Sequence, residues 1–262
     1  MASRQLGRLA AAALALCAIA GASLAGQRDT ARPAPEKERA PIGVIELFTS
    51  QGCSSCPPAD ALFADFAARK DVVALAYHVD YWDYLGWKDT LSSKKNTERQ
   101  YGYMRAFKTR SVYTPQAVIN GRVHVNGASR VAVDNALTGM DKAEKGMLVP
   151  VTVTRQGDGV VIDAGDAGTH ASGAANAHVV VVYFDPPQAV SIGKGENSGR
   201  SQVYWNAVSD IQTAGMWHGK AQRYELPMSA IAKKGGCAVL LQAVGADGLP
   251  GPILGAALVR NP

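Results

Sequence analysis

Two cysteines separated by two serines are the residues of this chain best suited to chemistry. They form the run Cys53-Ser54-Ser55-Cys56, which follows an apolar stretch at 42–48 and a turn at 49–52. Pro57 and Pro58 come next, and proline is tolerated in the first turn of a helix because the N–H groups there have no helical partners. The pattern therefore predicts a cysteine pair between a buried strand and the start of a helix.

A cysteine at the start of a helix is suited to act as a nucleophile. Backbone N–H groups and the helix dipole stabilise its thiolate, and a second cysteine one turn later can reach it to close a small ring. In such a pair Cys53 attacks a substrate disulfide, and Cys56 then resolves the mixed disulfide. We therefore predict a thiol–disulfide oxidoreductase that acts on protein or small-thiol disulfides and needs no cofactor. This role requires that the Cys53 sulfur be accessible and close to Cys56.

Two other classes of protein remain open from these residues. Two thiolates suit Cu(I), a soft ion, and His78 or Met104 would have to complete such a site. Alternatively, Cys53 and Cys56 form a permanent disulfide in a non-catalytic binding module. Zinc needs four ligands, and the sequence has no second C-x-x-C and no H-x-x-x-H, so we assign no metal site.

The first half of the chain alternates strand-like and helix-like runs. The dipeptide Asn120-Gly121 is a strong signal for a two-residue hairpin turn. Such an order predicts an α/β domain over residues 42–146. The expected strands are 42–48, 72–79, 117–120 and 122–126, and the expected helices are 59–70, 92–107 and 130–145.

After Gly146 the helical periodicity disappears. Short strand-like runs follow one another, punctuated by Gly and Pro, which predicts an all-β, sandwich-like domain over 147–262. The run 193–200 lacks the spacing of a phosphate-binding loop and precedes a strand. We assign it to a loop of this second half that packs against the first.

The N-terminus has the pattern of an export signal. Arg4 and Arg8 precede an apolar run at 9–20, and small residues follow at 23–25, which predicts a signal peptide over 1–25. Residues 26–41 are rich in charge, alanine and proline and are assigned to a flexible leader. We therefore expect a secreted or periplasmic protein, where disulfides persist, with no stable membrane insertion after cleavage.

The charge of the chain excludes one class of partner. The formal net charge is +5, with basic residues spread along the 262 residues rather than gathered in a stripe. A protein that binds nucleic acid normally carries a dense basic patch, so we expect no nucleic-acid partner.

Thr114-Pro115 directly precedes the third expected strand. The order of strand, C-x-x-C, helix, strand, helix, Thr-Pro, hairpin and helix resembles the thioredoxin superfamily. The resemblance implies a thioredoxin-like fold for 42–146, a cis Pro115 beside the cysteines, and contact between Thr114 and bound substrate. On the residues alone, a trans proline opening a strand is the alternative. The sequence departs from thioredoxin at its buried acid, because Leu47 takes that position and Glu46 should face the other side of the sheet.

Long stretches resemble one bacterial secreted family, domain-of-unknown-function family 1223. The resemblance extends from about residue 42 to the end of the chain and implies the fold and export, but no substrate. The matching stretches are ELFTSQGCSSCPPAD (46–60), HVDYWDYLGWKD (78–89), RQYGYM (99–104), TPQAVINGR (114–122) and GENSGR (195–200).

Three further features have both a functional and a structural interpretation. The aromatic loop at 81–87 follows a strand whose carboxyl end should border the site, so Trp82 is a candidate for substrate binding; core packing is the alternative. His78 and Asp80 point the same way on an extended strand, which suits a proton relay or a metal contact; a hydrogen-bonded structural histidine is the alternative. Cys237 lies in an apolar run and is expected to be a buried, inert thiol.

Overall fold

A computed structural model describes residues 40–262, apart from 144, 157–158, 170–175, 228–233 and 261–262. The predicted signal peptide (1–25) and nearly all of the predicted leader (26–41) lie outside the described residues. Within the described part, no helix is long and apolar enough to cross a membrane.

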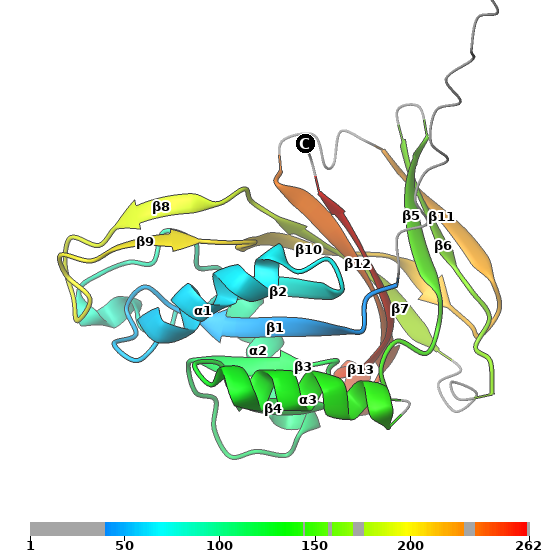
Figure 1. Cartoon of the computed structure of the whole chain (residues 1–262), viewed down its shortest axis with the longest axis horizontal. Helices are drawn as coiled ribbons and strands as arrows, with labels where there is room; N and C mark the ends of the chain where they lie inside the picture. The colour runs from blue at the N-terminus through cyan, green and yellow to red at the C-terminus, as the bar shows by residue number, and fades with distance from the viewer. Residues whose placement is uncertain (1–39, 144, 157–158, 170–175, 228–233, 261–262) are drawn as a thin grey trace, which may run out of the picture. The chain divides into compact units, whose positions relative to one another are not determined.

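The first half of the described chain forms one four-stranded sheet with its helices (Figure 1). The strands stand in the order β2-β1-β3-β4; β1 and β2 are parallel, and the other neighbours are antiparallel. This order of strands and helices along the chain agrees with the sequence-based one. The elements are β1 (Gly43–Thr49), α1 (Pro57–Ala68), β2 (Val72–His78), the 3-10 helix η1 (Asp83–Leu85), α2 (Lys94–Ala106), β3 (Gln116–Ile119), β4 (Val123–Asn126) and α3 (Arg130–Lys142).

The second half is built from strands in three sheets, with orders β10-β7-β12-β13, β11-β6-β5 and β8-β9. Its neighbouring strands are antiparallel throughout the described part. The elements are β5 (Val151–Gln156), β6 (Gly159–Ala164), β7 (Ala177–Phe184), β8 (Gln188–Ser191), β9 (Ser201–Tyr204), β10 (Val208–Trp217), β11 (Gln222–Pro227), β12 (Gly236–Val244), the 3-10 helix η3 (Ala246–Gly248) and β13 (Pro250–Arg260).

The predicted fold class, an α/β thioredoxin-like domain followed by an all-β, sandwich-like domain, is wrong. The described residues contain thirteen strands in four sheets and only three α-helices, so the fold is β-rich. They cluster as one compact unit. The boundary placed at 146–147 stays a prediction.

A shared hydrophobic core is the physical reason for this correction. Phe48 of β1 and Tyr77 of β2 belong to the same buried cluster as Val182 of β7 and Leu240 of β12. One face of the first sheet is therefore covered by strands of the second half. Periodicity in the sequence shows that such a face is buried, but it does not show what covers it.

The Asn120-Gly121 turn was predicted correctly. It also connects the first half of the chain to β13 of the second half through a hydrogen bond. Both residues have positive φ, 52° and 60°, as a tight two-residue hairpin requires. The Asn120 side-chain oxygen accepts a hydrogen bond from the Val44 N–H at 2.7 Å. Its backbone oxygen accepts one from Ile253 of β13 at 2.9 Å.

A buried ion pair lies on the face of β1 opposite the cysteines. Arg99 of α2 donates from Nε to the Glu46 carboxylate at 2.6 Å and from Nη2 to the Gln242 side chain of β12 at 3.0 Å. The Tyr103 hydroxyl donates to the same carboxylate. Leu47 instead joins the cluster around α1. Glu46 therefore faces away from the cysteine side of the sheet, as predicted.

Loss of this ion pair should destabilise the whole unit. Arg99→Met leaves the fully buried Glu46 carboxylate without its cation, which should lower the free energy of unfolding by about 3–5 kcal/mol. Adding Glu46→Gln should restore part of the loss. The control is Lys95→Met, which removes an exposed pair with Asp210 and should cost less than about 1 kcal/mol. Equal losses for Arg99→Met and Lys95→Met in denaturant unfolding would contradict the assignment.

Candidate functional site

Cys53 and Cys56 form a disulfide at the start of α1, where the sequence placed them. Their Cα atoms are 5.4 Å apart. Cys56 is the N-cap residue of the helix, and its N–H donates to the Cys53 carbonyl at 3.1 Å. Pro57 and Pro58 occupy the first helical positions, as predicted.

The segment Thr114–Pro115 lies against this disulfide. The peptide bond between the two residues is cis, so the prediction for Pro115 is confirmed. The Thr114 hydroxyl donates to Cys53 Sγ at 3.2 Å. Ser55 Oγ lies 3.4 Å from the same sulfur and donates to the Thr114 carbonyl at 3.3 Å. The structure thus brings together four of the predicted site residues across 61 positions of sequence.

Trp82 contacts the site through Thr114. Its indole N–H donates to the Thr114 hydroxyl at 2.8 Å, which leaves that hydroxyl's own proton for Cys53. Gly52 makes room for this contact, because a Cβ there would lie 3.1 Å from the Trp82 carbonyl oxygen. Trp82 therefore orients Thr114, and its role in substrate binding stays a prediction.

The accessibility expected for Cys53 is wrong for this closed arrangement. Cys53 is 1% exposed and Cys56 is fully buried. The cover is shallow, because Ser54 and Ser55 are exposed and both Thr114 and Trp82 are partly exposed. A partner thiol can therefore reach Cys53 only if this thin layer of side chains shifts.

Asn197, from the loop between β8 and β9, anchors the cysteine loop. Its buried side-chain amide donates to the backbone oxygens of Gln51 at 3.0 Å and of Cys53 at 2.8 Å. The loop at 193–200 packs against the first half, as predicted. Sequence reasoning did not single out Asn197, although it lies within the family stretch GENSGR.

Loss of the Asn197 amide should loosen the disulfide loop. Asn197→Leu removes two buried hydrogen bonds and should lower the free energy of unfolding by about 2 kcal/mol. We also expect faster reduction of Cys53–Cys56 by dithiothreitol, followed by quenched alkylation and mass spectrometry. Ser198→Ala is the control, since the Ser198 hydroxyl bonds within its own loop, to the Gly193 carbonyl. An unchanged reduction rate for Asn197→Leu would argue against anchoring.

A buried polar cluster lies beside the disulfide. His78 Nδ1 is 2.8 Å from the Asp89 carboxylate, and the Thr49 hydroxyl donates to Asp60 Oδ1 at 2.7 Å. The Tyr204 ring packs edge-on against His78. Within the described part of the chain, Asp60 Oδ2 and His78 Nε2 have no hydrogen-bond partner. The histidine is thus a hydrogen-bonded one, with Asp89 as its partner.

Asp80, the partner suggested by sequence, lies elsewhere. It accepts a hydrogen bond from the Thr97 hydroxyl at 2.6 Å. The partner of His78 comes instead from a loop eleven residues further along the chain. Alternation along one strand could not indicate this loop contact, because it depends on how the chain folds back after β2.

Burial and neighbouring charges shift the three titratable groups of the cluster. Burial raises the pKa of Asp60 to about 7, against the opposing effects of His78 and the Thr49 hydroxyl. For His78, burial lowers the pKa, but the carboxylates of Asp89 and Asp60 outweigh it and the net shift is upward. For Asp89, burial raises the pKa, but His78 and hydrogen bonds outweigh it and the net shift is downward.

The raised pKa of Asp60 predicts a pH-dependent stability. The folded protein holds this proton above the unfolded value of 3.8, so the free energy of unfolding should fall between about pH 4 and pH 7, by about 4 kcal/mol at most. Asp60→Asn should remove this fall and keep the further decline that His78 causes above its unfolded value of 6.5. Asp65→Asn, an exposed change on the same helix, is the control and should keep the wild-type fall. Denaturant unfolding at several pH values measures it, and identical slopes for wild type and Asp60→Asn would refute it.

A third ligand for a metal ion is not found at the cysteines. Among the described residues, no group of three or more His, Cys, Asp or Glu side chains is placed to hold an ion. His78 Nδ1 is engaged with Asp89. The geometry therefore gives the Cu(I) hypothesis no support.

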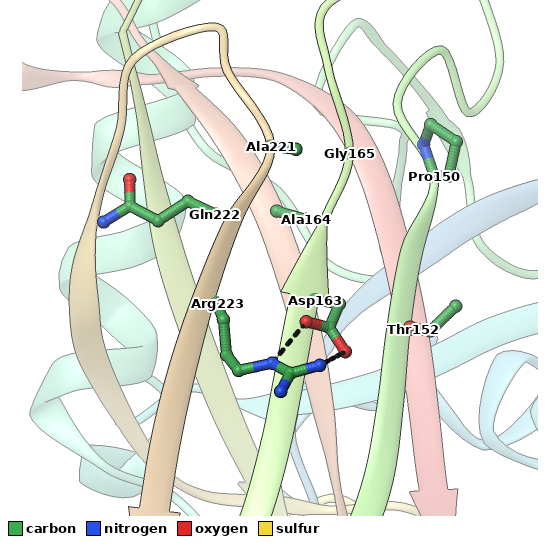
Figure 2. A pocket seen from close by; sticks show the side chains of 8 residues that line it. All are labelled: Pro150, Thr152, Asp163, Ala164, Gly165, Ala221, Gln222 and Arg223. Carbon is green, nitrogen blue, oxygen red and sulfur yellow. Dashed lines mark hydrogen bonds and ion pairs between the residues drawn. The ribbon is translucent and has the colours of Figure 1, made fainter.

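A surface hollow of about 400 Å³ lies on the β11-β6-β5 sheet and has no residue in common with the disulfide site (Figure 2). Arg223 and Asp163 form a bidentate ion pair across it, at 2.8 and 3.3 Å. The rest of the hollow is lined by Pro150, Thr152, Ala164, Gly165, Ala221 and Gln222. Because Arg223 and Asp163 are paired with each other, we propose no binding function for this hollow.

Fold and site together define a β-rich protein with a buried C-x-x-C disulfide that is held against a cis-proline segment. The family model "Protein of unknown function (DUF1223)" matches residues 44–242, and the chain belongs to this family.

The chain is also similar to two solved structures. The chain is similar to protein AGR_C_4864 of Agrobacterium tumefaciens, with 49% identity, a TM-score of 0.76, and coverage of 85% of this chain and 95% of that one. It also resembles HBP35 of Porphyromonas gingivalis, with 11% identity, a TM-score of 0.60, and coverage of 84% and 75%, which shows similarity of fold alone. A search of curated proteins found no match.

Proposed function

We propose that this protein is a thiol–disulfide oxidoreductase that acts outside the cytoplasm, secreted or periplasmic, through Cys53 and Cys56. The observation that carries the proposal is the hydroxyl donor at Cys53. Thr114, held by Trp82, donates to Cys53 Sγ, and Ser55 Oγ lies within hydrogen-bond distance. In the described structure no such group contacts Cys56 Sγ.

This asymmetry supports different roles for the two sulfurs. A hydrogen bond to sulfur is stronger when the sulfur carries negative charge, so the Thr114 hydroxyl favours the thiolate at Cys53 over the one at Cys56. In the reduced protein Cys53 is then the nucleophile, and Cys56 resolves the mixed disulfide. Thr114, next to the cis Pro115 and bonded to Cys53 Sγ, is the residue proposed to contact the substrate.

The closed cover sets a condition on this activity. With Cys53 only 1% exposed, the Thr114 hydroxyl and the Trp82 indole have to shift before a protein or small-thiol disulfide can reach the sulfur. Their partial exposure and the exposed Ser55 make this a movement of side chains rather than of the core.

A second candidate function rests on the same burial. A permanently closed Cys53–Cys56 disulfide in a non-catalytic binding module would also be buried and anchored by Asn197. In that case the hydrogen bond from the Thr114 hydroxyl to Cys53 takes no part in a reaction, and the disulfide should resist reduction. The two candidates differ in the reactivity of Cys53 once the disulfide is opened.

Alkylation of the reduced protein tests the proposal. After reduction with dithiothreitol, iodoacetamide should modify Cys53 first, with a midpoint below the free-cysteine value of about 8.5. Cys237 should stay unmodified at neutral pH, because it is buried and burial raises its pKa to about 11.

Thr114→Val is the matched variant, since it keeps the side-chain shape and removes the hydroxyl. It should raise the Cys53 midpoint by about one pH unit. A disulfide that resists dithiothreitol in the native protein, or a Cys53 that titrates near 8.5 in both forms, would select the non-catalytic alternative.

A further inference from the structure

Ring closure at this site needs a proton acceptor inside the protein. Before Cys56 can attack, its thiol must lose a proton, and the residue is fully buried. Neither neighbouring side chain of β1 provides the acceptor. Leu47 is apolar and packs in the cluster around α1, and Glu46 is on the opposite face with Arg99. The acceptor has to come from another element.

Asp60 is placed one helical turn after Cys56. Its N–H donates to the Cys56 carbonyl at 3.1 Å, and side chains four residues apart on a helix are neighbours on one face. Thr49 fixes Asp60 Oδ1, while Oδ2 is buried and has no hydrogen-bond partner among the described residues. A buried carboxylate oxygen without a donor is costly and therefore indicates a use.

The surroundings of Asp60 tune it to neutral pH. The titratable groups that act on it are His78 of β2 and Asp89 of the loop after η1. Burial and, to a smaller extent, Asp60 raise the pKa of Tyr204 of β9. Burial raises the pKa of Asp60 to about 7. A group with such a value exchanges protons readily with a thiol near neutral pH.

We propose that Asp60 is the proton acceptor and donor for the Cys56 thiol during thiol–disulfide exchange, with the charge of the nearby His78 stabilising its carboxylate. This inference rests on the proposed function. It assigns a role to the unpartnered atoms Asp60 Oδ2 and His78 Nε2, which the exchange at Cys53 does not use.

The step balances as follows for a substrate joined to Cys53 in a mixed disulfide. The Asp60 carboxylate takes the proton of the Cys56 thiol, and the thiolate so formed attacks Cys53 Sγ. The bond between Cys53 and the substrate sulfur breaks, and its electron pair leaves on the substrate sulfur. The Cys53–Cys56 disulfide forms, the protein loses two electrons and the substrate disulfide is reduced. In the reverse direction protonated Asp60 returns the proton to Cys56.

Glutathione disulfide is the probe for this step. Reduced protein is mixed with it between pH 5 and pH 9, quenched with acid, and analysed by mass spectrometry for the mixed disulfide at Cys53 and for the closed disulfide. In the wild type, the first-order rate of ring closure should rise with pH and level off, with a midpoint near 7.

Two variants separate the chemistry of Asp60 from its packing. Asp60→Asn keeps an oxygen for the Thr49 hydroxyl and cannot titrate; ring closure at pH 7 should slow on the order of 100-fold and keep rising with pH. Thr49→Val keeps the acid and removes the hydrogen bond that lowers its pKa, so the midpoint should move to higher pH with the plateau retained.

The outcomes are distinguishable. A wild-type pH profile in Asp60→Asn overturns the role of Asp60 while exchange itself stands. If the plateau in the pH profile disappears in Thr49→Val as well as in Asp60→Asn, the effect is one of packing, which also overturns the role of Asp60. If the wild-type protein forms neither a mixed nor a closed disulfide with glutathione disulfide, the proposed function itself fails.

Discussion

The packing of β1 and β2 against β7 and β12 is the contact on which the rest of the structure depends. Together with α2 it buries the face of β1 that carries the carboxylate of Glu46. A buried charge must be paired, and Arg99, Tyr103 and Gln242 gather around it from α2 and β12. The other face of β1 carries Leu47 and α1. One face of the sheet therefore packs against the second half of the chain, and the other face packs against α1, at whose start the cysteines lie.

The disulfide site is assembled from segments that are far apart in the sequence. The loop before α1 supplies the sulfurs, Thr114 supplies a donor, and Asn197 satisfies two carbonyls of the loop. Each contact fills a hydrogen-bonding need that burial creates, since buried backbone oxygens without donors are costly. The same contacts explain why Cys53 is covered although its neighbours Ser54 and Ser55 are exposed.

Local signals in the sequence were sufficient for the parts of the site that depend on neighbouring residues. The cysteine pair at a helix start follows from Pro57 and Pro58, and the tight turn at Asn120-Gly121 follows from residues that tolerate positive φ. The fold class was not predictable in this way, because periodicity does not reveal that β7 and β12 cover the first sheet. Two contacts depend on the same kind of long-range packing. They are the pairing of His78 with Asp89 and the hydrogen bonds from Asn197 to the cysteine loop.

Because Asn197 anchors the cysteine loop, that loop cannot complete its folding until the ribosome has synthesised residue 197. The hydrogen bonds to Gln51 and Cys53 span 146 and 144 residues, so the loop acquires its final shape only after most of the polypeptide has emerged. An amino-terminal fragment would hold Cys53 and Cys56 without this support. The disulfide site is thus completed only when a distant segment without cysteines packs against it.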